Sequence, residues 1–244
     1  MPQALDIEKS LTKAENFQKG QVLLIDKPLE WTSFDVVKKI RYLIKIKKIG
    51  HAGTLDPLAT GLLILCTGKR TKSIEQFMAD EKEYTGSFTL GQVTDSYDLE
   101  SEPSAPVDIS HLTEEQIREA TLPFTGEIEQ VPPMHSAIKV DGKRLYKLAR
   151  QGKSIELKSR TVIISEFEIV KVDLPKVEFR VVCSKGTYIR SLASDFGKAL
   201  GVGAHLSALR RTRIGNQHVK DAWQLTDFID HVKALEEDLP SAQN

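Results

Sequence analysis

One carboxylate stands out in this chain because of the residues around it. Asp56 lies between two glycines, Gly53 and Gly61, and Pro57 follows it directly. The glycines allow tight turns on either side, and the proline biases the aspartate toward extended backbone. Residues 62–66 form a short apolar run that predicts a buried strand. Asp56 is therefore expected on a loop that leads into the core, a common place for a reactive side chain, although an isolated Asp-Pro pair is more often only a turn.

The flanking segments predict the elements that hold this loop. Residues 21–25 predict a strand, and residues 33–44 predict a helix with Ser33 as its N-cap, because apolar residues recur at helical spacing. The same criteria predict short helices over 73–78, 113–120 and 143–150, strands over 82–91, 160–172 and 177–183, and a longer helix over 187–200.

Length and composition limit the possible classes of protein. The chain has 244 residues and a formal net charge of zero. No apolar run approaches the ~18 residues of a membrane span, and no signal peptide is recognisable. The two cysteines, Cys66 and Cys183, lie in apolar, strand-like runs and are expected to be small buried hydrophobes, not a disulfide or metal site. We expect a cytoplasmic protein without a bound metal.

Zero net charge conceals a strong segregation of charge. Ten acids lie between residues 95 and 129, and six more between 221 and 238. Any one basic cluster alone is most simply a solvated surface, but the segregation permits a basic, nucleic-acid-binding face on a neutral protein. The basic clusters are six residues over 38–48, eight residues over 139–160, and the group Arg210, Arg211 and Arg213.

The Asp56 loop resembles a known active-site motif. His51, Gly53 and the run Leu55-Asp-Pro-Leu-Ala-Thr-Gly61 are similar to the motif of the TruB family of tRNA pseudouridine synthases. Those enzymes isomerise the T-loop uridine at tRNA position 55. The resemblance implies that Asp56 is the catalytic aspartate and that His51 contacts RNA near the flipped nucleotide. The sequence alone leaves open whether Asp56 attacks C1′ or C6 or removes the 2′ proton.

Further blocks resemble the family in the same order, from about residue 21 to residue 223. Tyr84 matches the tyrosine that stacks on the target base, and Leu209 would line the base pocket. The block from 183 to 190 assigns Tyr188 to the substrate pocket and Arg190 to a pair with Asp56.

The resemblance also implies segments that bind RNA. Residues 131–160 resemble a mobile thumb that closes on the T-arm. Lys27 belongs to a Lys-Pro motif that supports the active-site loop or contacts the RNA backbone, although Glu30 stands where the family usually has glycine. The side chains expected on the RNA backbone are Lys27, Lys143, Arg144, Lys147 and Arg211.

These resemblances imply an α+β pseudouridine synthase fold, with a mixed, mostly antiparallel sheet flanked by helices. We expect a catalytic domain over 21–228, an N-terminal tail over 1–20 and a short polar tail over 229–244, with no room for the C-terminal PUA domain of many relatives. The expected activity is isomerisation of uridine 55 in tRNA by a monomer that needs no cofactor. The alternative is a non-catalytic module that binds or folds tRNA.

Overall fold

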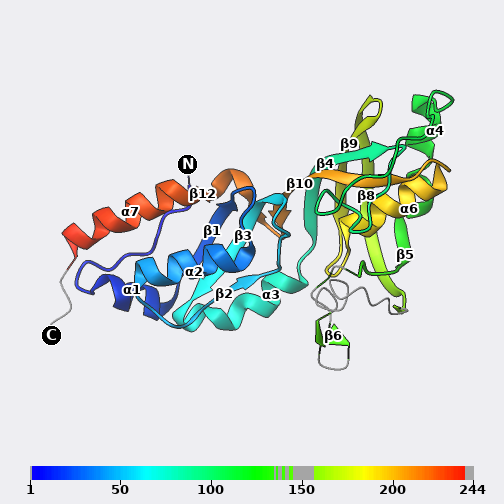
Figure 1. Cartoon of the computed structure of the whole chain (residues 1–244). Helices are drawn as coiled ribbons and strands as arrows, with labels where there is room; N and C mark the ends of the chain where they lie inside the picture. Colours follow the sequence, from blue (N-terminus) through cyan, green and yellow to red (C-terminus); the bar gives the residue numbers. More distant parts are fainter. Residues whose placement is uncertain (1, 135, 137–138, 141–142, 145–156, 240–244) are drawn as a thin grey trace. The chain divides into compact units, whose positions relative to one another are not determined.

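The computed structural model describes residues 2–134, 136, 139–140, 143–144 and 157–239 (Figure 1). It divides into two compact units. The first unit combines Met1–Glu83 with Arg210–Asn244, and the second is Tyr84–Leu209. The chain passes between the units within two strands, β4 (Lys82–Leu90) and β10 (Ala204–Ile214).

A small mixed sheet forms the centre of the first unit. Strand β1 (Val22–Lys27) pairs in parallel with β12 (Trp223–Gln224) and antiparallel with β3 (Ala59–Thr67), and β3 also pairs antiparallel with β2 (Ile49–Ala52). The other elements of this unit are α1 (Lys13–Gly20), α2 (Ser33–Ile44), η1 (Gly68–Ser73), α3 (Ile74–Ala79), β11 (Gln217–His218), η3 (Val219–Asp221) and α7 (Leu225–Asp238).

Both faces of this sheet are buried, which explains the unbroken apolar run that predicted β3. Leu63 and Leu65 join one core cluster with Ile40 of α2 and Phe228 of α7. Their neighbour Ile64 joins a second cluster, against which side chains of α3 pack. Because successive strand residues point to opposite faces, a strand covered on both sides reads as continuously hydrophobic.

Helix α2 begins one residue earlier than the sequence predicted. Thr32, not Ser33, is the N-cap, and its side chain accepts a hydrogen bond from the Asp35 N–H. The Asp35 carboxylate in turn accepts from the Thr32 N–H at 3.0 Å, which completes a capping box. The hydroxyl of Ser33 is used in another way, at the loop that carries Asp56.

Both segments that were expected to be tails contain helix, because residues 13–20 form α1 and residues 229–238 belong to α7, so the prediction of tails was wrong for these residues. Helix α1 starts with a capping box between Thr12 and Glu15, and its Phe17 is fully buried. Helix α7 extends to Asp238, and Phe228 and Val232 on it are fully buried in the core of the first unit. Burial of these side chains stabilises both helices beyond what their propensities alone supply.

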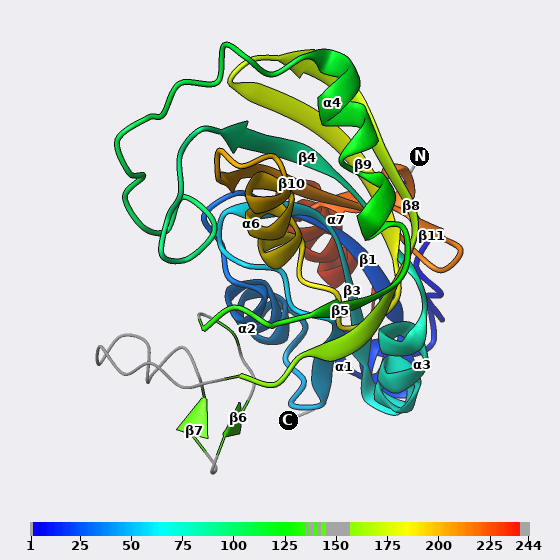
Figure 2. The same cartoon turned by 90° about the vertical axis from the view of Figure 1, so that its right-hand side faces the viewer.

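The second unit has its own core cluster, built on antiparallel strands (Figure 2). Strand β9 (Lys176–Cys183) pairs antiparallel with β8 (Arg160–Asp173), and β8 pairs antiparallel with β5 (Gly126–Gln130). Phe88 of β4 stacks on Phe179 of β9 with ring centroids 4.1 Å apart, and Phe196 also packs on it. The helices of this unit are α4 (Glu114–Glu119), η2 (Leu122–Phe124) and α6 (Ile189–Ala199).

One predicted helix is only partly described. Lys139–Val140 and Lys143–Arg144 form a two-stranded sheet, β6 and β7, so residues 143 and 144 are extended where a helix over 143–150 was expected. Residues 145–150 lie outside the described residues.

No helix in the described ranges is long and apolar enough to cross a bilayer. The mixed sheets with flanking helices confirm the α+β prediction.

Candidate active site

Asp56 lies in the connection between β2 and β3, at the end of a β-hairpin. Its carbonyl accepts a hydrogen bond from the Ala59 N–H at 3.1 Å, which closes the turn. The preceding residue, Leu55, is buried and anchors the loop. Ser33 clamps it from α2: the Ser33 hydroxyl accepts from the Leu55 N–H at 2.8 Å and donates to the Leu55 carbonyl at 3.1 Å. The Asp56 side chain is partly exposed, as a group that meets substrate must be.

Lys27 holds the same loop from the end of β1. Its side chain is fully buried, and its ammonium donates to the carbonyls of Pro28, Trp31 and Pro57 at 2.8, 2.5 and 3.3 Å. Burial lowers the pKa of Lys27 to about 8, and the charge of Asp56 acts in the opposite direction. Lys27 therefore fastens the Asp56 loop to the loop after β1 and places a positive charge within electrostatic reach of Asp56.

Glu30 occupies the position where the family motif usually has glycine. Its φ of 65° lies in the left-handed region that favours glycine, and its N–H donates to the Pro57 carbonyl at 2.9 Å. The glutamate therefore keeps the tight turn that the sequence put in doubt. The cost of left-handed backbone for a residue with a Cβ is about 1–2 kcal/mol.

Arg211 supports the loop from β10. Its side chain is only 1% exposed, and it donates from Nε to the Leu62 carbonyl at 2.7 Å and from Nη2 to the Gly53 carbonyl at 3.1 Å. Gly61 lies against its backbone, because a Cβ there would be 2.3 Å from the Arg211 carbonyl oxygen. Glycine is required at this position by close approach as well as by a φ of 101°.

These positions correct two predictions about RNA contacts. Lys27 and Arg211 are enclosed by the protein, so neither side chain is placed to meet an RNA phosphate. The rest of the third basic cluster is paired with acids: Arg210 forms a two-pronged ion pair with Asp26, at 3.0 and 2.6 Å, and Arg213 pairs with Glu81 at 3.0 Å. This cluster therefore serves the fold of the first unit.

His51 lies on β2, five residues before Asp56. Burial lowers its pKa, and the charge of Arg211 lowers it further, while a hydrogen bond with the Gly53 backbone has the opposite effect. The imidazole is therefore neutral at physiological pH. It is suited to hydrogen bonding with RNA, not to pairing with a phosphate as a cation.

The second unit holds the other predicted substrate-contacting residues. Tyr84 and Leu209 are partly buried and pack against its core cluster. Tyr188 is the N-cap of α6, so it lies just before the helix and not in its first turn. Its backbone N–H donates to the Gln130 side chain at 2.8 Å, and the Arg160 guanidinium lies over its ring at 4.7 Å.

Arg190 is buried in the second unit, beside the loop that carries Ser96 and Asp98. Its Nε is 3.4 Å from an oxygen of Asp98, and its Nη1 donates to the Ser96 carbonyl at 3.2 Å. Asp98 also accepts from the Ser96 hydroxyl at 2.6 Å and from the Glu100 N–H at 3.0 Å. The predicted pair of Arg190 with Asp56 would join the two units and stays a prediction.

Of the basic residues expected on the RNA backbone from the thumb, Lys143 and Arg144 lie in β7, and Lys147 is outside the described residues.

Comparison with known proteins gives consistent matches. The chain matches the model of the TruB family pseudouridylate synthase N-terminal domain over residues 41–189, and that of the tRNA pseudouridylate synthase B C-terminal domain over residues 190–242. A tRNA pseudouridine synthase B of Flavobacterium johnsoniae is 57% identical over 226 residues, which are 90% of this chain and 99% of the relative. The tRNA pseudouridine synthase B of Phocaeicola vulgatus is 54% identical over 219 residues, 87% of this chain and 93% of the relative.

Solved structures match over most of the chain as well. A chain in the crystal structure of a Cbf5-Nop10-Gar1 complex has a TM-score of 0.71 and 32% identity, covering 93% of this chain and 59% of that one. A chain in the structure of an H/ACA RNP bound to a substrate RNA containing 2′-deoxyuridine has a TM-score of 0.68 and 28% identity, covering 97% of this chain and 63% of that one. This chain thus spans about three fifths of the length of these structural relatives.

Proposed function

Because the chain belongs to the TruB family of pseudouridylate synthases, we propose that it converts uridine to pseudouridine at position 55, in the T-loop of tRNA. The observation that carries the proposal is the Asp56 loop. This loop combines the family motif with a carboxylate that is partly exposed and a backbone held by Lys27, Ser33 and Arg211. The relatives named tRNA pseudouridine synthase B support tRNA as the substrate.

The proposed reaction is an isomerisation that places modest demands on the protein. The bond between uracil N1 and ribose C1′ breaks, and a bond between uracil C5 and C1′ forms in its place; C5 loses its proton to solvent and N1 takes one up, so the atoms balance. The base must first leave its stack and enter a pocket. Asp56 then acts as nucleophile or general base, and either role requires the ionised carboxylate. An opposite charge nearby, here Lys27, favours the ionised form of a carboxyl group.

The other predicted residues have distinct roles in the proposal. Tyr84 stacks on the flipped uracil, Leu209 and Tyr188 line its pocket, and Arg190 pairs with Asp56. Neutral His51 donates or accepts a hydrogen bond beside the flipped nucleotide. The basic side chains expected to bind the T-arm backbone from the thumb are Lys143, Arg144 and Lys147.

The proposal includes action as a monomer in the cytoplasm. Cys66 and Cys183 are both buried and neither forms a disulfide, which fits a reducing compartment.

The decisive test is incubation with an unmodified tRNA transcript, followed by mapping of pseudouridine at each position. Pseudouridine should form at position 55. The Asp56→Asn variant should lose turnover, because the amide neither ionises nor attacks. Its tRNA affinity should stay within about tenfold, or ~1.4 kcal/mol, because the rest of the interface is intact. Turnover by the variant would refute the role of Asp56. Tight tRNA binding by the wild type without product would instead support a non-catalytic tRNA-binding module.

A further inference from the structure

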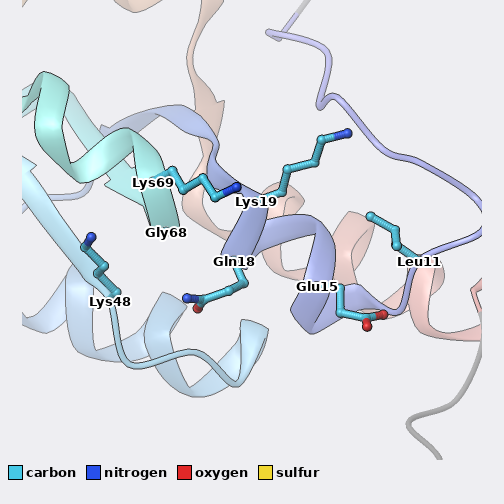
Figure 3. Close-up of a pocket in the computed structure, with 7 residues that line it drawn as sticks. All are labelled: Leu11, Glu15, Gln18, Lys19, Lys48, Gly68 and Lys69. Carbon is cyan, nitrogen blue, oxygen red and sulfur yellow. The ribbon is translucent and has the colours of Figure 1, made fainter.

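The first unit has a surface groove made of residues outside the Asp56 loop. Figure 3 shows it between α1, the start of η1 and the segment that leads into β2. The groove has a volume of about 290 Å³. Three lysines and four other residues line it: Lys19, Lys48 and Lys69, with Leu11, Glu15, Gln18 and Gly68. A groove of this size admits part of a polymer such as one nucleotide, because ordinary ligand sites begin at about 300 Å³.

The walls of this groove are fixed to one another at Gly68. The Gly68 N–H donates to the Lys48 carbonyl at 2.8 Å. A Cβ on Gly68 would lie 2.0 Å from the Gln18 carbonyl oxygen, so α1 packs directly on the backbone of η1. Next to it, the Thr67 hydroxyl donates to the Phe17 carbonyl at 2.7 Å. The backbone that carries the three lysines is therefore preorganised, and binding would order only the lysine side chains.

The charges of the groove are not balanced. Lys19 pairs with Glu8 at 2.7 Å, and the carboxylate of Glu15 is bound by Thr12 in the capping box of α1. Lys48 and Lys69 are exposed, and within the described ranges neither has an ion-pair partner. Two exposed ammonium groups, one on the residue after Gly68 and one on the residue whose carbonyl Gly68 binds, suit a chain of phosphates better than a single small anion, because each lysine acts as a separate point charge.

We propose that this groove binds the phosphodiester backbone of the RNA substrate through Lys48 and Lys69. The inference rests on the proposed function, and it adds a second contact region to the residues around the reacting uridine. Because the groove contributes no residue to the Asp56 loop, its contacts are equally strong in the ground state and the transition state. Loss of such uniform binding raises KM and leaves kcat unchanged.

The first experiment compares two double variants that remove the same charge. Lys48→Ala with Lys69→Ala empties the groove of its unpaired charge, and Lys220→Ala with Lys233→Ala removes two exposed lysines elsewhere in the first unit. The dissociation constant for tRNA is measured at increasing KCl concentrations. Each lost phosphate contact reduces the slope of log K against log salt by about 0.7–0.9, so the groove variant should lose about 1.5 from the slope. The control variant should keep the wild-type slope.

A second variant tests whether removing a negative charge from the groove strengthens tRNA binding. Glu15→Gln removes the acid that lines the groove, and it retains the capping box because glutamine can fill the same position as glutamate. We expect tRNA to bind about twofold more tightly at low salt and no more tightly at high salt, because the interaction is with an exposed charge. Thermal unfolding of each variant, with midpoints close to the wild type, shows that the fold is retained.

The outcomes separate this proposal from the proposed function. An unchanged salt slope in the groove variant, or an equal loss in the control variant, overturns the groove as an RNA-binding site. Turnover is measured on the same preparations. If the wild type makes no pseudouridine, the proposed function fails, while the salt slopes still report whether the groove binds RNA. A groove variant with a lower kcat at saturating tRNA, in place of a higher KM, also contradicts the inference.

Discussion

Replacing Lys27 by methionine tests how the Asp56 loop is held. Methionine is also unbranched and fits the buried site, but it has no charge and no donor. The substitution leaves three carbonyls, those of Pro28, Trp31 and Pro57, without the ammonium that now binds them. Only the last belongs to the loop of Asp56. A matched control is Lys82→Met, because Lys82 is also buried and its ammonium donates to the carbonyls of residues 77, 78 and 80, beside α3.

Two opposing effects set the size of the stability change. Losing the donor costs about 1–2 kcal/mol for each carbonyl, or ~3–6 kcal/mol for the three. In the opposite direction, a pKa of about 8 in place of 10.5 means that the folded protein disfavours the charged lysine by about 3 kcal/mol, at ~1.4 kcal/mol per pH unit. The free energy of unfolding of Lys27→Met should therefore fall by no more than about 3 kcal/mol.

The activity of the same variant should fall much more than its stability. The hydrogen bond to Pro57 fixes the residue directly after Asp56, and a displacement of about 1 Å at a reacting group costs on the order of 100-fold in rate. Single-turnover formation of pseudouridine at saturating enzyme measures this rate, and urea unfolding measures the stability. Lys82→Met should lose stability and keep its single-turnover rate within a few-fold. A Lys27→Met variant with a normal rate would refute the positioning role.

The pH dependence of stability gives an independent check with a defined sign. Below pH 8, Lys27 is protonated in both the folded and the unfolded protein. Between about pH 8 and 10.5, only the unfolded chain keeps this proton, so the contribution of Lys27 to stability improves as pH rises. The stability of the wild type relative to Lys27→Met should increase by up to about 3 kcal/mol across this range. Parallel curves for the two proteins would show that Lys27 has an ordinary pKa.

Three further outcomes follow from the geometry. Gly61→Ala should reduce the free energy of unfolding by about 3 kcal/mol or more, since the new Cβ meets backbone at 2.3 Å with φ at 101°; a stable variant by urea unfolding would contradict the close approach. Thr32→Ala should cost about 1 kcal/mol through loss of the α2 cap, and an unchanged thermal midpoint would count against it. Neutralising the thumb residues Lys143, Arg144 and Lys147 together should reduce the slope of log K for tRNA against log salt by about two to three. An unaltered slope would show that the thumb does not contact the RNA.

Local patterns predicted the elements around Asp56 because each pattern indicates its element without any information about distant contacts. The apolar run over 62–66 became the centre of β3, and the helical spacing after Ser33 became α2. The sequence could not decide between Thr32 and Ser33 as the N-cap, because both hydroxyls fit that role. The choice is set by Leu55, which binds the Ser33 hydroxyl from 22 residues away.

The two helices that were taken for tails had signals that charge obscured. At the start of α1, Thr12 and Glu15 have the spacing of a capping box, and Phe17 supplies one deeply buried side chain. In α7, apolar residues at 225, 228 and 232 follow the i, i+3, i+7 pattern of one helix face. The six acids between residues 221 and 238 make this segment polar on average, so its apolar face is not apparent from composition.

The buried cations were beyond prediction for a physical reason. Whether Lys27 or Arg211 meets solvent depends on which carbonyls surround it, and for each of them at least one comes from a segment far away in the sequence. The Pro57 carbonyl lies 30 residues from Lys27, and the Gly53 carbonyl 158 residues from Arg211. A basic residue near an RNA-binding motif is therefore easily predicted to contact phosphate when it is in fact buried and binds the carbonyls of the loop.

The division of the first unit between both ends of the chain affects the order in which the protein can fold during synthesis. Its strands β1 and β3 leave the ribosome early, but β12, which pairs with β1, and α7, which covers Ile40 and Leu63, are made last. The second unit is continuous from residue 84 to 209, so its chain is complete before that. A nascent chain stalled once residue 209 has emerged from the ribosome should therefore protect the second unit from protease while the apolar faces of β1 and β3 stay available to chaperones.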